Sequence, residues 1–158
     1  MTNRDTVVSY LLRGASGLWG LRGEPTDNHW HLVCAGPGAD FDVHVTFTGG
    51  WVFFQAPLLK TAAHPRCRAG LAHYLLRASD EMLLAKFSLD DRGQVLLAAE
   101  WPKESFDFAA FRALSEAFVE YLGQHATEVR VLSQDARLAG FAEGGLPEPE
   151  DEPQVVLR

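Results

Sequence analysis

The chain has 158 residues, of which 47% are hydrophobic, and this combination favours one globular domain with a buried core. Its net charge of -7 disfavours direct binding to nucleic acid or to anionic lipid, because the long-range field repels phosphate. The first residues lack the pattern of a signal peptide, and no apolar run is long enough to span a membrane. We therefore expect a cytoplasmic protein with no membrane partner.

The N-terminal part of the chain predicts one helix followed by a glycine-rich connection. The helix is expected over residues 2–13, with an apolar face that includes Val7, Tyr10 and Leu11. The connection over residues 14–28 lacks the Gly-Lys-Ser/Thr ending of a phosphate-binding loop. Trp19 and its apolar neighbours suit a free loop poorly, so we expect part of this connection to pack as an arm or a short strand.

Three strands are predicted next, over residues 30–34, 41–48 and 51–57. The middle strand alternates strictly between apolar and polar residues. Gly49-Gly50 suits a two-residue hairpin, which pairs Thr48 with Trp51 and Thr46 with Phe53. These two aromatic residues are therefore expected on the face opposite the core residues, which are Val45, Phe47, Val52 and Phe54.

A second helix, a second hairpin and a long third helix complete the predicted domain. The second helix begins near Pro65, and the hairpin strands cover residues 83–89 and 95–101 around a loop at 90–93. The third helix is expected from Ser105, as N-cap, to about Leu132. The acidic, proline-rich composition that follows predicts a domain over residues 1–138 and a mobile tail over residues 139–158, whose Val155–Leu157 end could dock.

The predicted order is α-β-β-β-α-β-β-α, an α+β domain with a five-stranded antiparallel sheet and helices packed on it. The segments at 51–58, 75–95 and 99–102, together with the Phe-rich last helix, resemble the YbjN-like family, which shares its fold with the type III secretion chaperones. The resemblance extends over roughly residues 2–132. It implies a small cytoplasmic homodimer that binds other proteins, as the secretion chaperones hold unfolded or extended client segments.

Metal and cofactor sites are not favoured by the pattern of ligand-type residues. Cys34 and Cys67 have no zinc-type spacing and are interpreted as reduced, partly buried thiols. His29, His31 and His44 could converge on a metal from neighbouring strands, but histidines without a defined spacing are more often part of a strand surface. We therefore predict no metal and no cofactor.

Catalytic chemistry is not favoured either. No serine lies in a Gly-x-Ser-x-Gly elbow, and Asp90-Asp91 beside Gly93 is typical of a turn. Glu100, on an apolar strand, must face solvent, pair or shift its pKa. Lys86 is a possible cross-strand partner of Glu100, and the alternative is an edge position.

Trp51 and Phe53 are the strongest candidates for a functional surface. Either the second helix or the glycine-rich arm covers them, or they form a dimer or client-binding surface, since an uncovered apolar patch usually marks an interaction site. The residues assigned to that candidate surface are Trp51, Phe53, Thr46, His44 and Trp19.

Two functional hypotheses follow. The first is a non-enzymatic, dimeric protein-binding module, chaperone-like or an adaptor in bacterial regulation or stress response. Its client could itself be a nucleic-acid-binding protein. The alternative is a small ligand-binding or enzymatic domain that uses the cleft between sheet and helices, although the sequence shows no polar constellation for it.

Overall fold

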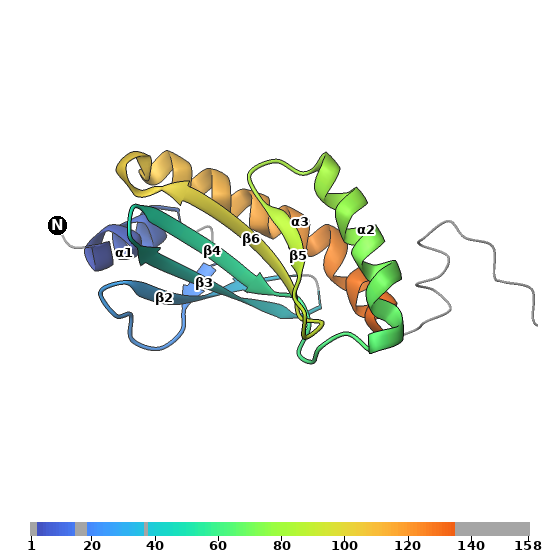
Figure 1. Ribbon diagram of the computed structural model, residues 1–158. Helices are drawn as coiled ribbons and strands as arrows, with labels where there is room; N and C mark the ends of the chain where they lie inside the picture. Colours follow the sequence, from blue (N-terminus) through green and yellow to red (C-terminus); the bar gives the residue numbers. More distant parts are fainter. Residues whose placement is uncertain (1–2, 15–18, 37, 135–158) are drawn as a thin grey trace, which may run out of the picture.

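The structure is a computed structural model that describes residues 3–14, 19–36 and 38–134 (Figure 1). The tail predicted from residue 139 lies outside the described residues. The helices are α1 (Asn3–Gly14), α2 (Arg68–Glu81) and α3 (Phe108–Gln134), with 3-10 turns η1 (Pro65–Cys67) and η2 (Lys103–Ser105). The strands are β1 (Trp19–Leu21), β2 (His29–Ala35), β3 (Asp40–Thr48), β4 (Trp51–Pro57), β5 (Lys86–Leu89) and β6 (Val95–Pro102).

The strands form one antiparallel sheet in the order β1-β2-β3-β4-β6-β5. The α+β class is confirmed, but the prediction of five strands was wrong because β1 adds a sixth. This strand comes from the glycine-rich connection, where Trp19 pairs with Cys34 and Leu21 with Leu32. Trp19 packs against the core, which explains why this part of the connection joins the sheet.

The β3–β4 hairpin has the predicted register. Thr48 lies opposite Trp51 and Thr46 opposite Phe53. Gly49 adopts a φ of +56°, which a residue with a side chain reaches only at a cost. Because side chains alternate across a strand, this register places Trp51 and Phe53 on one face of the sheet and Val52 and Phe54 on the other.

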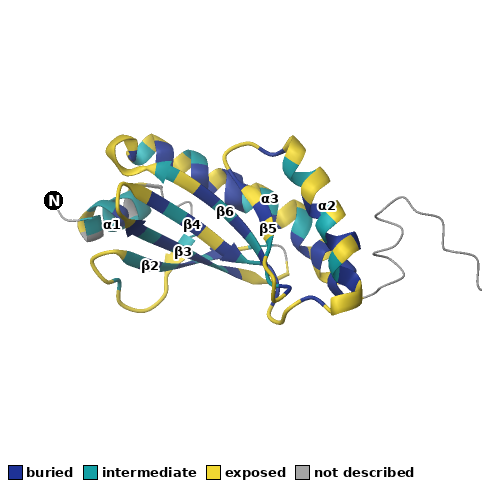
Figure 2. Ribbon diagram, in the orientation of Figure 1, coloured by how far each residue is buried: buried dark blue, intermediate teal, exposed yellow. Residues whose placement is uncertain are grey.

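The hydrophobic core lies between α3 and the inner face of the sheet. In Figure 1, α3 runs behind the sheet, while α2 lies beside β5. Phe54 is completely buried, and its ring centroid lies 5.8 to 6.2 Å from the rings of Phe106, Phe111 and Phe118. Buried and exposed positions alternate along the strands in Figure 2, as expected for a sheet covered on one face.

The third helix begins later than predicted. Ser105 lies in η2, and its hydroxyl donates to the carbonyl of Pro102, so its prediction as N-cap was wrong. Asp107 caps the helix instead, since its carboxylate accepts a hydrogen bond of 2.8 Å from the backbone N–H of Ala110. Phe106 is buried in an extended conformation between the two, which delays the start of the helix.

The strand predicted from residue 83 begins only at Lys86, because a tight turn precedes it. Leu84 has a φ of +66°, and the N–H of Ala85 donates to the carbonyl of Leu83 at 2.7 Å, the pattern of a strained γ-turn. The Lys86 ammonium donates to two carbonyls at the end of α2, those of Ser79 and Met82.

The structure does not support an ion pair between Lys86 and Glu100. Lys86 lies opposite Ala98 on β6, two residues from Glu100, and its ammonium is directed to α2. Glu100 is exposed and pairs only with Phe53 on β4, because the pairing of β6 with β5 ends at Ala98, so Glu100 has the edge position that was the alternative. Of the three outcomes considered for this carboxylate, it faces solvent.

Candidate protein-binding face

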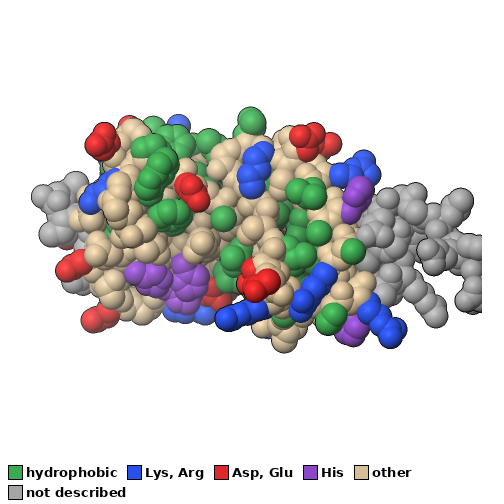
Figure 3. All heavy atoms as spheres, in the orientation of Figure 1, with side chains coloured by type: hydrophobic (Ala, Val, Ile, Leu, Met, Phe, Trp, Pro, Cys, Tyr) green, Lys and Arg blue, Asp and Glu red, His purple; other side chains and the backbone are tan. Residues whose placement is uncertain are grey.

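The outer face of the sheet is the surface formed by the strand side chains that point away from α3. None of the described helices packs on it. Trp51 is 47% exposed at the end of β4, opposite Pro102. Phe53, half-buried, lies between Thr46 on β3 and Glu100 on β6. Figure 3 views this face and shows apolar side chains close to a group of histidines.

Four of the five predicted site residues share this outer face. Trp51, Phe53, Thr46 and His44 lie on adjacent strands, with His44 two residues from Thr46 and opposite Gln55. Trp19 does not join them. It lies opposite the buried Cys34 and packs against the core from the other side of the sheet. Neither α2 nor the described part of the glycine-rich connection covers Trp51.

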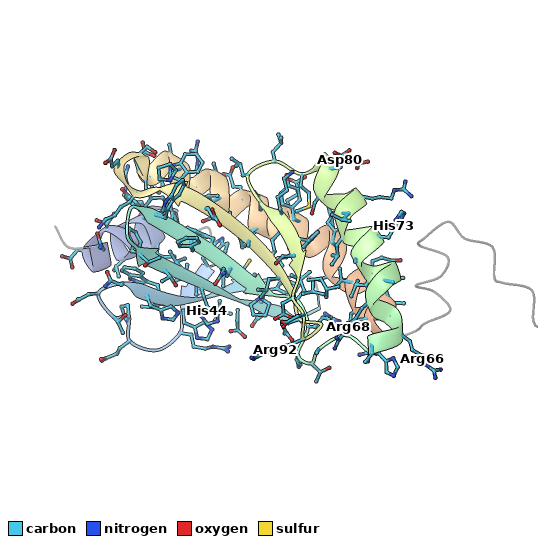
Figure 4. All side chains as sticks on the ribbon, viewed as in Figure 1. His44, Arg66, Arg68, His73, Asp80 and Arg92 are labelled. Carbon is cyan, nitrogen blue, oxygen red and sulfur yellow. The ribbon has the colours of Figure 1, made fainter. Side chains whose placement is uncertain are left out.

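Three histidines form a stacked row beside this aromatic pair. The ring of His44 stacks on that of His31 at 4.5 Å between centroids and on that of His29 at 5.3 Å. Nδ1 of His44 lies 3.1 Å from Nε2 of His29. Figure 4 shows His44 at the sheet surface. Neighbouring positions on two antiparallel strands bring the rings together, as the strand placement predicted.

One carboxylate holds the end of this row. Oδ1 of Asp42 lies 2.7 Å from Nε2 of His31 and 3.0 Å from the guanidinium of Arg22. Within the described ranges, no group of three or more His, Cys, Asp and Glu side chains has an arrangement that could hold a metal ion. The histidines converge on each other and on Asp42, which gives the outer face a titratable edge.

The row predicts a loss of stability at mildly acidic pH. Partial burial and the neighbouring charges of His31 and His29 lower the pKa of His44 below 6.5, against an opposing effect of Asp42. The folded protein therefore binds fewer protons at His44 than the unfolded chain does. The resulting loss of stability begins as pH falls below 6.5 and is complete below the folded pKa. Imidazole proton NMR should show a His44 pKa below 6.5.

Urea unfolding at several pH values tests the same prediction thermodynamically. His125 also has a lowered pKa, caused by burial and opposed by Glu81, so His44→Gln should reduce the pH dependence without abolishing it. Gln55→Ala, at an exposed position on the same face and without a titratable group, is the control and should leave the dependence unchanged. A folded His44 pKa at or above 6.5 would contradict the prediction.

A second exposed apolar surface was not predicted from the sequence. The leucine corner comprises Leu76 on α2 with Leu83 and Leu84 in the γ-turn, which are 73%, 76% and 46% exposed. The Tyr121 hydroxyl accepts a hydrogen bond from the N–H of Leu83 and holds the turn against α3. Sequence periodicity placed Leu83 inside a strand. The apolar run over residues 82–85 is longer than the end of α2 and the start of β5 can bury, and this length was the signal that could have predicted exposed leucines.

A hollow of about 490 Å³ lies at the far end of the sheet. It is bounded by residues 38–42, residues 57–61 and the last turns of α3, including Arg130, Ser133 and Gln134. No His or Glu lines it among the described residues. Its charged lining residues are Asp40, Asp42, Lys60 and Arg130.

Both cysteines are buried, and neither forms a disulfide with a described residue. Burial, with a smaller contribution from the charge of Asp40, raises the pKa of Cys34 to about 11. A thiol with such a pKa is poorly reactive at neutral pH because the thiolate is the nucleophile. Both side chains are more deeply buried than the predicted partly buried thiols.

The fold and the outer face define a small α+β domain with an uncovered aromatic surface and no recognisable catalytic centre among the described residues. No described helix is long and apolar enough to cross a membrane. No protein-family model matches the sequence, and no curated protein is detectably similar to it.

Three solved structures share the fold at low sequence identity. A chain of the ExoU–SpcU complex from the type III secretion system of Pseudomonas aeruginosa has 17% identity and a TM-score of 0.51, covering 83% of this chain and 97% of that chain. YbjN from E. coli has 16% identity and a TM-score of 0.57, covering 80% and 90%. A chain of the ExsC–ExsE complex has 14% identity and a TM-score of 0.51, covering 82% and 97%.

These similarities confirm a YbjN-like fold of the type III secretion chaperone kind. Two of the three structures are complexes between different proteins, as their names state. At identities of 14 to 17% the likeness establishes architecture alone.

Proposed function

We propose that this protein is a non-enzymatic, homodimeric protein-binding module, chaperone-like or an adaptor, that binds a client protein in the bacterial cytoplasm. The observation that carries the proposal is the uncovered aromatic pair Trp51 and Phe53 on the outer face. The fold shared with chains of two protein complexes supports it. The two buried cysteines, which form no disulfide with a described residue, fit a reducing compartment.

The chemistry of the outer face suits an extended or amphipathic client segment. Trp51 and Phe53 offer large rigid aromatic surfaces, the type of side chain that dominates binding energy at protein interfaces. Thr46 and His44 beside them supply polar groups for a rim. Burial yields about 25 cal/mol per Å² before association costs, so the two rings can anchor a contact while neighbouring residues provide the rest.

Self-association is assigned to the leucine corner in this proposal. Leu76, Leu83 and Leu84 form an apolar group separate from the outer face, and exposed leucines of this size are best buried against another chain. A homodimer through this corner leaves both outer faces free for clients. Static light scattering on the wild type should give the mass of a dimer, and Leu76→Ser with Leu83→Ser should give that of a monomer.

The double substitution Trp51→Ala, Phe53→Ala tests partner binding directly. Both side chains point away from the core, so the fold should survive while client capture falls at least about tenfold, the result of losing about 1.4 kcal/mol or more. Crosslinking of full-length protein in bacterial cells, followed by quantification of each captured partner, measures the effect. Light scattering on the same variant reports whether this face also contributes to self-association.

Gln55→Ala is the matched control for this experiment. It lies on the same strand and the same face, is exposed, and removes no aromatic surface. Its capture profile should equal that of the wild type. Unchanged capture and unchanged self-association in the double variant would rule out the outer face as the functional surface.

The hollow at the end of the sheet favours a ligand-binding domain as the second candidate function. Its volume of about 490 Å³ falls in the range of small-molecule sites. Ligand-observed NMR with a metabolite mixture tests this candidate. A compound that binds and shifts the amide signals of Leu59 and Ser133 would favour it over a purely protein-binding role.

A further inference from the structure

A basic surface surrounds the end of α3, in contrast to the acidic chain as a whole. It comprises Lys60, Arg66, Arg68, Arg92 and Arg130, all at least partly exposed. Figure 3 shows Lys and Arg side chains over the β5–β6 turn and the start of α2, and Figure 4 labels Arg66, Arg68 and Arg92 there. Positive charge is concentrated here although the net charge of the chain is -7.

Backbone hydrogen bonds hold these cations in one place. The guanidinium of Arg68 donates to the carbonyls of Ala63, Asp91 and Arg92 at 3.4, 3.1 and 2.9 Å. These contacts bind the start of α2 to the β5–β6 turn. The N–H of His64 donates to the carbonyl of Ser133 at 3.0 Å, so the segment that carries Arg66 lies against the end of α3.

The charge of this surface is not neutralised by the described part of the chain. None of its five cations forms an ion pair with a described carboxylate; the ion pairs present involve Arg22, His31 and Arg112. Asp90 and Asp91 lie in the same turn, and Asp40 and Asp42 line the hollow. Asp42 is paired with Arg22, so a positive balance remains. The N-terminus of α2, where backbone N–H groups concentrate positive potential, adds to it.

An acidic segment of the same chain follows α3 in the sequence. Residues 143–152 contain Glu143, Glu148, Glu150, Asp151 and Glu152 and no basic residue. Glu148 follows Gln134 by fourteen residues, a length that reaches roughly 50 Å at most. Gln134 itself lines the hollow together with Lys60 and Arg130. A connection of this length gives a high effective concentration of the acidic segment at the basic surface.

We infer that residues 143–152 bind the basic surface of the same molecule, with their carboxylates paired to Arg66, Arg92 and neighbouring cations. The segment occupies a site whose chemistry also suits an acidic stretch of a partner, and so competes with it. This inference does not depend on the proposed client-binding role of the outer face. Its contacts are electrostatic and lie at the protein surface, so salt should weaken them.

A nitroxide placed on the full-length protein at Gln154→Cys tests the inference. The native cysteines are buried, so the new thiol is the one that reacts. At an ionic strength of about 0.01 M, where charges interact over roughly 30 Å, the amides of Arg66, Arg68 and Arg92 should lose most of their NMR signal intensity. At about 1 M, where screening reduces this range to roughly 3 Å, the signals should recover.

Matched variants separate charge pairing from nonspecific proximity. Glu148→Gln, Glu150→Gln, Asp151→Asn and Glu152→Gln together should restore the signals at low salt, as should Arg66→Gln with Arg92→Gln. Arg112→Gln removes a cation about 30 Å along α3 and should change nothing. Signals that persist in the labelled wild type would overturn the inference.

The same label distinguishes binding within one molecule from binding between copies. In a mixture of isotope-labelled protein without nitroxide and unlabelled protein with nitroxide, only contacts between molecules broaden the observed amides. The inference is supported if the amides do not broaden in this mixture but do broaden in protein that carries both the isotope label and the nitroxide in the same molecule. Equal broadening in both samples would overturn it and assign the surface to a second copy.

Discussion

Phe54→Ala is expected to reduce the free energy of unfolding by roughly 3 to 5 kcal/mol, the range for removing a fully buried phenylalanine ring. Phe54 is 0% exposed, and three phenylalanines from η2 to the middle of α3 surround its ring. Removing it leaves a cavity between the sheet and α3 that neither rigid layer can close. Urea unfolding followed by circular dichroism measures the loss.

Phe53→Ala is the matched control one residue away. It removes the same ring from the same strand but from the outer face, so the cost should be about 1 kcal/mol or less. The order of the two effects is reversed for binding, because Phe53→Ala should reduce client capture more than Phe54→Ala does in molecules that remain folded. Equal destabilisation by the two substitutions would show that the outer face is covered in solution and would remove the basis of the proposed interface.

This contrast was predictable from the sequence because it depends on short-range rules. The alternation from Phe41 to Phe47 and the Gly49-Gly50 turn determine the register, and the register alone determines which of Phe53 and Phe54 is buried. The stacking of His29, His31 and His44 depends instead on the β2–β3 register, which the Gly49-Gly50 turn does not determine. Local pattern therefore predicted the aromatic part of the outer face.

Other features depend on contacts between distant segments, which periodicity does not report. Trp19 pairs with Cys34 and packs against the core, which makes it part of a strand. The pairing with the buried Cys34 also places Trp19 on the inner face of the sheet. Phe106 is drawn into the core and moves the helix start to Asp107. The γ-turn at Leu84 depends on a hydrogen bond from Leu83 to Tyr121, 38 residues away.

The basic surface shows the same limit for function. Its cations are dispersed in the sequence between Lys60 and Arg130, within a chain of negative net charge. Arg68 brings the start of α2 to the β5–β6 turn through backbone carbonyls, which no residue pattern predicts. The folded chain brings these cations together near the end of α3. Their positive charge is therefore concentrated in the structure although it is dispersed along the sequence.

Gly93→Ala should disrupt this junction and destabilise the protein by about 3 kcal/mol or more. Gly93 has a φ of +82°, where an alanine is strained by about 1 to 2 kcal/mol. An added Cβ would also lie 2.6 Å from Nε of Arg68 and 3.0 Å from the carbonyl oxygen of Ala63. Arg68 must then leave its carbonyl acceptors, and hydrogen bonds of a charged donor contribute about 1.5 to 3 kcal/mol.

Gly49→Ala separates the two causes. Gly49 also has a positive φ, +56°, but no atom lies within 4 Å of its added Cβ, so only backbone strain of about 1 to 2 kcal/mol is expected. Urea unfolding of both variants gives the difference, which measures the crowding at Arg68. If the two substitutions reduce the free energy of unfolding equally, Arg68 moves aside at no cost in stability. The β5–β6 turn would then not depend on the hydrogen bonds of Arg68.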